Sequence, residues 1–319
     1  KDFLVTQLQS KVQMVEIDDG SVGQRIDNFL LRILSGVPKS YVYKVIRKGQ
    51  VRVNKGRIKP VYKLQLGDIV RVPPVSQQEV VAPTIHDGFL AMLRESIIFE
   101  DDKLIVINKP SGLAVHGGSG LQYGLIEGMR ALMPECKELE LVHRLDRATS
   151  GCILIAKKRS MLRALHELLR NNQMNKVYWT LVQGRWPKKK IMVQAPLLKN
   201  TVQSGERLVR VTPQGKPALT EFSPIQVSGR ASLVKAKPVT GRTHQIRVHA
   251  QHSGHAIAGD DKYGDAGFDA DLKTLGLNRL FLHAYSLEFT VLDKTYQVVA
   301  PLPDPLPAVV EALGLRLPG

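Results

Sequence analysis

The clearest pattern of apolar and polar positions lies at residues 25–35, which read RIDNFLLRILS. Apolar side chains recur there at the i, i+3, i+4, i+7 and i+8 spacing of an amphipathic helix. The residues with this spacing are Ile26, Phe29, Leu30, Ile33 and Leu34. A helix over this segment is therefore the first element that the sequence predicts.

A second, shorter helix is predicted from a Ser40 cap to Gly49, because serine can cap the free amides at a helix start and glycine readily takes the left-handed conformation that ends helices. The chain then alternates apolar and polar residues over 51–72, VRVNKGRIKPVYKLQLGDIVRV. Turn signals at residues 54–56 and 67–68 divide this stretch, which predicts short strands. These elements form a small unit, assigned to residues 21–74, behind an N-terminal segment of residues 1–20.

A linker is expected next, because residues 73–88, PPVSQQEVVAPTIHDG, hold three prolines and show no period. We assign it to residues 75–95 and assign a second, larger domain to residues 96–319. Strands and helices alternate irregularly in that domain, and neighbouring strands often follow each other without a helix between them, which predicts an α+β fold with a mixed, largely antiparallel sheet. The expected strands are 98–107, 151–157, 177–183, 232–237 and 279–289, and the expected helices are 122–133, 160–172 and one near the C-terminus.

Charge points to a polyanionic partner. The formal net charge is +16, and from Lys39 to Arg71 ten basic residues stand against one acid. Nucleic acid is the first candidate and a membrane surface the second. The candidate RNA-binding residues are Lys44, Arg47, Lys48, Arg52, Lys55 and Arg57.

The sequence gives no sign of membrane insertion or of a disulfide framework. It has no apolar run near 18 residues and no charged-then-apolar start, so we expect a soluble, cytoplasmic protein. Cys136 and Cys152 lack a CxxC partner, which fits a reducing compartment, and we interpret both as small core hydrophobes.

Several familiar chemistries lack their patterns. The HGGSG run at 116–120 lacks the Lys-Ser/Thr ending of a phosphate-binding loop, and no GxSxG elbow is present. Four histidines crowd into residues 244–255, but their spacing matches no metal motif, so a polar helix surface is the better interpretation. A metal-dependent RNA hydrolase remains the third hypothesis for function.

Two segments offer candidate chemistry. TGRTHQIRVHAQHSGH, residues 240–255, predicts a helix from a Thr243 cap to Gly254, although a short strand remains an alternative; Arg247 lies on that helix. It could equally be part of a solvated basic surface. In MNKVYWTLVQG, residues 174–184, strict alternation predicts a strand, where Tyr178 is either core or a stacking surface for a base.

The acid Asp146 stands alone among bases in LVHRLDRATSGCILIAKK, residues 141–158. Such an acid is either a structural ion pair or a carboxylate kept ready for chemistry, and pattern alone leaves both open. The TSG turn ends just before an apolar strand, and a loop there can project a side chain into a cleft. Arg147 is interpreted as surface charge.

At these residues the sequence resembles the RluA-type pseudouridine synthases. HRLDRATSG, residues 143–151, resembles the family signature HRLDxxTSG. VINKPSGLAVHGG, NKVYWTLVQG, GRTHQIRVH and RLFLHA resemble further family motifs in the family's order, and together the motifs span residues 98–289. The N-terminal unit resembles an S4 RNA-binding domain.

The resemblance implies an enzyme that isomerises uridine to pseudouridine in large-subunit (23S) ribosomal RNA, as a monomer and without metal or cofactor. It implies that Asp146 is the essential aspartate, Tyr178 packs on the target base, Arg247 is the basic partner of Asp146, and Arg144 enters the space that the flipped uridine leaves. Whether the aspartate forms a covalent adduct or abstracts a sugar proton stays open. A non-catalytic RNA-binding ribosome-assembly factor is the alternative; a mere binder has no need of the aspartate-centred loop.

Overall fold

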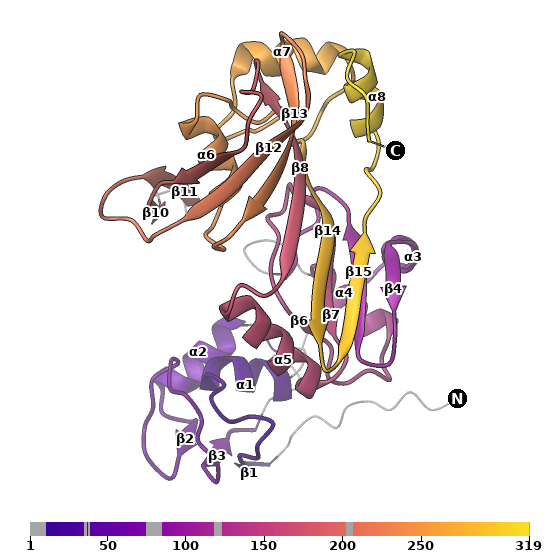
Figure 1. Ribbon diagram of the computed structural model, residues 1–319. Coiled ribbons are helices and arrows are strands. Elements are labelled where there is room, and N and C mark those ends of the chain that lie inside the picture. The colour runs from indigo at the N-terminus through magenta and orange to yellow at the C-terminus, as the bar shows by residue number, and fades with distance from the viewer. Residues whose placement is uncertain are drawn as a thin grey trace. The chain divides into compact units, whose positions relative to one another are not determined.

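The computed structural model describes residues 11–34, 37, 39–74, 85–117, 123–201 and 207–318. The chain divides into a smaller unit, built from the chain up to Ile85, and a larger unit that begins at His86 (Figure 1). Residues 75–84 of the predicted linker lie outside the described residues. The rest of that prediction needs correction, because residues 87–95 form helix α3, whose Leu93 is buried in the core of the larger unit.

The smaller unit places two helices on a three-stranded antiparallel sheet with the order β1-β3-β2. Its elements are β1 Gln13–Glu16, α1 Ile26–Ile33, α2 Lys39–Arg47, β2 Arg52–Val53 and β3 Ile69–Val72. Both predicted helices are confirmed, and Gly49 adopts the expected left-handed conformation at φ +68°. The second helix begins at Lys39, so Ser40 lies inside it and the predicted cap is wrong. The apolar stripe of α1 is buried, as its spacing predicts.

Asp68, the lone acid among ten bases, has a structural role. Its side chain is buried and accepts hydrogen bonds from Asn54 Nδ2 at 2.8 Å and Tyr62 Oη at 3.0 Å. Asn54 and Lys55 take positive φ angles in the predicted turn. The Asp68 carboxylate therefore links the turn at Asn54 to Tyr62.

The larger unit is built on a ten-stranded sheet with the order β4-β5-β7-β14-β8-β13-β12-β9, to which β15 adds beside β14 and β6 beside β7. All described pairs in this sheet are antiparallel except the short β7–β14 pair, which confirms the predicted mixed, largely antiparallel α+β fold. The strands are β4 Ile97–Glu100, β5 Leu104–Lys109, β6 Glu140–Leu141, β7 Ser150–Ala156, β8 Asn175–Gln183, β9 Ile191–Gln194, β12 Leu219–Val227, β13 Ala231–Pro238, β14 Leu282–Val291 and β15 Lys294–Val299. A separate hairpin pairs β10 Leu197–Thr201 with β11 Arg207–Val211.

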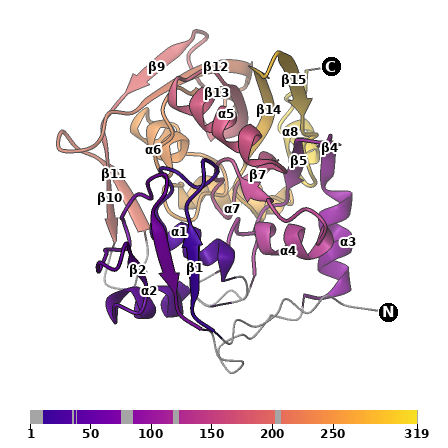
Figure 2. The ribbon, with the colours of Figure 1, turned by 90° about the horizontal axis from the view of Figure 1, so that it is seen from below.

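Helices cover this sheet and divide its apolar contacts into separate clusters. They are α3 Asp87–Glu95, α4 Leu125–Leu132, α5 Arg159–Arg170, α6 Gln245–His252, α7 Ala266–Thr274 and α8 Leu306–Ala312. Helices α3 and α4 lie side by side (Figure 2) and pack with β5 and β7 in one cluster. Helix α6 packs with β8, β12 and β13 in another. Tyr178 contacts both of these clusters, so it lies where they meet.

Part of the predicted element pattern needs correction. The stretch 98–107 is two strands, β4 and β5, because Asp101 accepts backbone hydrogen bonds from Lys103 and Leu104 in a turn between them. None of the described helices is long and apolar enough to cross a membrane.

Candidate active site

Asp146 lies in the loop that leads from β6 into β7, as the TSG turn predicted. Its backbone carbonyl accepts a hydrogen bond from the Thr149 amide at 3.1 Å, which closes a turn immediately before the buried strand. The Asp146 side chain is 29% exposed. A carboxylate in a tight turn with this exposure can reach a ligand without large motion of the backbone.

The buried Lys109 holds this loop from behind. Its Nζ donates hydrogen bonds to the carbonyls of Pro110 at 2.8 Å, Leu113 at 2.8 Å and Arg147 at 3.2 Å. Burial lowers the pKa of Lys109 to about 7, with a smaller contribution from the charge of Arg279, while Asp146 opposes the shift. The lysine thus joins the end of β5 to the aspartate loop.

Arg147 is exposed, as expected of a surface charge, and it also takes part in the same connection. Its Nε donates to the Gly112 carbonyl at 2.8 Å, and the Gly112 amide donates to the Arg147 carbonyl at 2.8 Å. Ser111 Oγ donates to the Ala148 carbonyl at 2.7 Å. Two loops distant in sequence therefore fix each other's backbone around Asp146.

Gly151 allows β7 to pass close to β14. Its φ is +107°, and a Cβ at this position would lie 2.3 Å from the Ala284 carbonyl oxygen. No side chain fits there, since real Cβ atoms do not approach backbone so closely. The close pairing of β7 with β14 thus requires the glycine of the TSG turn.

Arg247 brings its guanidinium to Asp146 from helix α6. Its Nη1 lies 3.9 Å from Asp146 Oδ2, and its side chain is 3% exposed. Its closest partner is the fully buried Asp260, which it contacts through Nε at 2.7 Å and Nη2 at 2.5 Å, and Nη2 also donates to Asp261 at 2.9 Å. Burial acts to lower the pKa of Arg247, but the bonds to Asp260 outweigh it and the pKa is raised.

The predicted helix at 240–255 is confirmed as α6, but its predicted cap and surroundings are wrong. The helix begins at Gln245, after His244 in a left-handed conformation, so Thr243 is not its cap. Gln245 Oε1 instead accepts from Thr240 Oγ1 at 2.6 Å and the Arg242 amide at 3.0 Å. The helix is largely buried rather than a solvated basic surface, because its polar side chains have partners in the interior.

The histidines of this segment have separate partners. The buried His249 pairs with Thr220 Oγ1 at 2.8 Å and the Ala195 carbonyl at 2.9 Å, which corrects its interpretation as helix surface. His244 Nδ1 pairs with Tyr263 Oη at 2.8 Å, and the Tyr263 ring lies against the Arg247 guanidinium. Over the described ranges, no group of three His, Cys, Asp or Glu side chains could hold a metal ion.

Tyr178 stands in the middle of β8, opposite Ala236 of β13 and Ala284 of β14. Burial and then the charge of Asp146 raise the pKa of Tyr178 well above its usual value, so the phenol stays protonated. Trp179 points to the opposite face, where it stacks on Tyr285 with ring centroids 3.8 Å apart. The predicted alternation is confirmed, and it turns Tyr178 to the face opposite Trp179.

Arg144 is exposed on the aspartate loop, where no acceptor for its guanidinium is found among the residues that the structure describes. Arg279 is a site residue that the sequence analysis missed. Its Nη2 donates to Ser150 Oγ at 2.6 Å, and burial lowers its pKa to about 10. Asp260 was missed as well, because nothing in its local pattern links it to Arg247, thirteen residues earlier. Lys109 lies in the VINKPSGLAVHGG motif, but nothing in its sequence pattern predicts a role for it.

The six candidate RNA-binding residues belong to the smaller unit, and all are exposed. Lys44, Arg47 and Lys48 share one face of α2 and the turn after it. Arg52 donates to the carbonyls of Gly49 at 3.2 Å and Lys55 at 3.3 Å. The structure therefore gathers these positive charges on the surface of one small unit.

Comparison with known proteins decides the family. Residues 103–252 match the RNA pseudouridylate synthase family, and residues 24–70 match the S4 domain. The ribosomal large subunit pseudouridine synthase C of Haemophilus influenzae is 60% identical over 284 residues, 88% of each chain. The chain belongs to the RNA pseudouridylate synthase family. It is thus a pseudouridine synthase, an isomerase, rather than a non-catalytic binder or a hydrolase.

Other relatives match this chain over most of their own length. The ribosomal large subunit pseudouridine synthase C of Escherichia coli K12 is 58% identical over 285 residues, 88% of this chain and 89% of that one. Among solved structures, human RNA pseudouridylate synthase domain containing 4 has a TM-score of 0.62 at 28% identity, covering 73% of this chain and 98% of that chain. The synthase fold is therefore shared with a distant relative.

Proposed function

We propose that this synthase isomerises specific uridines of large-subunit (23S) ribosomal RNA, with Asp146 as its catalytic carboxylate. The observation that carries the proposal is the buried Arg247 beside the partly exposed Asp146, at 3.9 Å, in the loop of the HRLDRATSG motif. The substrate follows from relatives of 55–60% identity that are named ribosomal large subunit pseudouridine synthase C.

The reaction moves the bond at C1′ from N1 to C5 of the base. The N1–C1′ bond of uridine breaks, the base turns and C5 bonds to C1′; C5 then loses its proton and N1 gains one. The sugar carbon gains positive charge as the base leaves, and a nearby carboxylate can stabilise or attack it, as in glycosidases. Arg247 complements the negative charge of Asp146 while Asp260 holds the guanidinium in place.

The neighbours of Asp146 suit a flipped base. Extrusion of a base costs a few kcal/mol of stacking, which an aromatic pocket and an inserted cation can largely offset. Tyr178 supplies a neutral aromatic ring beside the carboxylate, since burial keeps its phenol protonated. The exposed Arg144, two residues before Asp146, supplies a cation for the space that the uridine leaves.

The smaller unit supplies affinity with little sequence information. Its exposed lysines and arginines can neutralise phosphates, and such contacts position a protein on RNA without reading bases. Selection of the uridine then belongs to the larger unit.

The decisive experiment maps pseudouridines in ribosomal RNA from cells lacking the protein and from cells carrying either the native form or Asp146→Asn. The native form is expected to restore pseudouridine at defined positions of 23S RNA, and Asp146→Asn to restore none while still folding and binding RNA. Full restoration by Asp146→Asn would contradict the catalytic role, and unchanged RNA in the deletion would contradict the substrate.

A further inference from the structure

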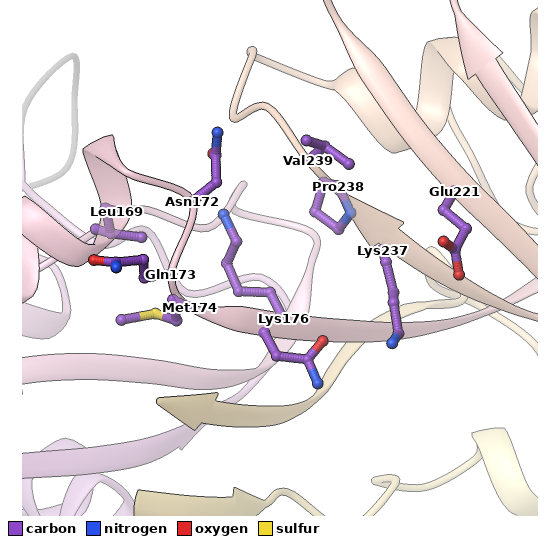
Figure 3. A pocket seen from close by; sticks show the side chains of 10 residues that line it. Leu169, Asn172, Gln173, Met174, Lys176, Glu221, Lys237, Pro238 and Val239 are labelled. Atoms are coloured by element: carbon purple, nitrogen blue, oxygen red, sulfur yellow. The ribbon is translucent and has the colours of Figure 1, made fainter. Parts of the chain in front are cut away.

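A cavity of about 350 Å³ opens in the larger unit beside the N-terminal part of β8 (Figure 3). Its lining combines the turn after α5, with Asn172 and Gln173, the strand residue Lys176, and the end of β13, with Pro238 and Val239. The cavity falls in the size range of small-molecule pockets. It thus offers apolar surface, amide groups and an ammonium within one open depression of nucleotide size.

Strand geometry connects this cavity to Tyr178. Side chains at i and i+2 share one face of a strand, so Lys176 and Tyr178 project to the same side of β8, roughly 7 Å apart along the strand. The register pairs Tyr178 with Ala236, which puts Pro238 on that side too. Figure 3 shows Lys176 and Pro238 on one side of the strands and Lys237 on the other. The cavity is therefore one step along the strand from the site of the target base.

Lys176 carries a charge that nothing nearby neutralises. Its side chain is partly buried, and among the residues that the structure describes no carboxylate or carbonyl accepts a hydrogen bond from its amine. Burial lowers the pKa of Lys176, and the lysine charge adds to burial in lowering the pKa of His143 to about 4. A half-buried ammonium without a partner favours an anion at its tip.

Glu221, the acid among the residues that line the cavity, does not compete for this lysine. Glu221 of β12 lies opposite Lys237 of β13 in the strand register, on the side of the sheet away from Phe222 and Ala236. Its carboxylate contacts Lys190 at 3.2 Å. The part of the cavity on the Tyr178 side of the sheet is therefore positive. None of the lining residues presents a carboxylate to an anion on that side.

We propose that this cavity binds the nucleotide next to the target uridine, with a phosphate on the Lys176 amine and the base against Pro238 and Val239. The amides of Asn172 and Gln173 then face the base edge or the ribose hydroxyl, where they can donate and accept hydrogen bonds. The inference rests on the proposed function, because it takes Tyr178 as the position of the flipped base. It makes the cavity a determinant of which uridine is chosen.

The test measures binding of Lys176→Met to an unmodified transcript of 23S RNA over a range of salt concentrations, together with pseudouridine formation. Loss of one charge-assisted phosphate contact is expected to weaken affinity about tenfold and to reduce the slope of log K against log salt by about 0.7. Pseudouridine formation at subsaturating RNA should fall together with the affinity. Lys176→Arg, which keeps the charge, should recover most of the affinity.

The matched control is Lys235→Met, because Lys235 lies on β13 opposite Trp179, on the face away from Tyr178. Native affinity and slope are expected for it. Equal losses in both lysine variants, or a Lys176→Met variant with native affinity and slope, would overturn the proposal. A native enzyme that forms no pseudouridine in this transcript would instead contradict the proposed substrate, which separates the two failures.

Discussion

At the scale of single residues, the site depends on two of the carboxylates that Arg247 contacts, those of Asp260 and Asp146. The guanidinium lies 2.5–2.7 Å from Asp260 but 3.9 Å from Asp146, so it is fixed by a carboxylate remote from the chemistry. The sequence predicted the Asp146–Arg247 pair only through family resemblance. It could not predict Asp260, since the partner of a buried arginine is chosen by tertiary packing and not by spacing along the chain.

Asp260→Asn should therefore destabilise the protein by about 3 kcal/mol, because breaking a buried ion pair leaves a charge without its main partner. Chemical denaturation measures the free energy of unfolding. Asp261→Asn is the matched control: its side chain contacts the same Nη2 at 2.9 Å but is 76% exposed, so its expected cost is below about 1 kcal/mol. Equal effects of the two substitutions would contradict this account.

At the scale of secondary structure, the site depends on the close parallel pairing of β7 with β14 directly after the aspartate loop. Strong periodicity made α1, α5 and β8 predictable, since each keeps one apolar face. Helix α6 was predicted as a helix, but its burial was not, because a polar sequence with internal partners for Gln245, Arg247 and His249 looks the same as a solvated one. Strands such as β9 are short and partly exposed, and their pattern is too brief to detect.

Gly151→Ala tests whether the close pairing of β7 with β14 requires a glycine. The new methyl group would lie 2.3 Å from the Ala284 oxygen in a backbone conformation that disfavours side chains, so β7 and β14 must separate. We expect a loss on the order of 3 kcal/mol in the free energy of unfolding, measured by thermal or chemical denaturation, with reduced activity in the fraction that folds. Gly229→Ala, where no atom lies within 4 Å of the added carbon, should cost less than about 1 kcal/mol. A native stability for Gly151→Ala would contradict the crowding argument.

At the scale of the whole molecule, composition was informative about the partner and silent about the reaction. A net charge of +16 predicts a polyanion, and the structure exposes the six candidate cations of the smaller unit. The reaction came from motifs whose residues lie far apart in sequence and meet only in the folded sheet. The parts of the site on α6 and in the 110–113 loop could not be placed by pattern alone.

Replacing Lys44, Arg47 and Arg52 together with glutamine should weaken RNA binding and flatten its salt dependence, because each phosphate contact contributes about 0.7–0.9 to the slope of log K against log salt. Filter binding across a salt series measures this slope. Substitution of Lys188 and Lys189, exposed lysines of the larger unit, by glutamine is the control and should change the slope less. A triple variant with the native slope would show that these residues of the smaller unit do not contact RNA phosphates.

Tyr178 touches two of the apolar clusters of the larger unit, and the site draws residues from both. The aspartate loop packs with β5 and β7, and Arg247 is carried by the helix that packs with β8 and β12. Neither cluster can assemble the site alone. Catalytic competence is therefore a property of their association.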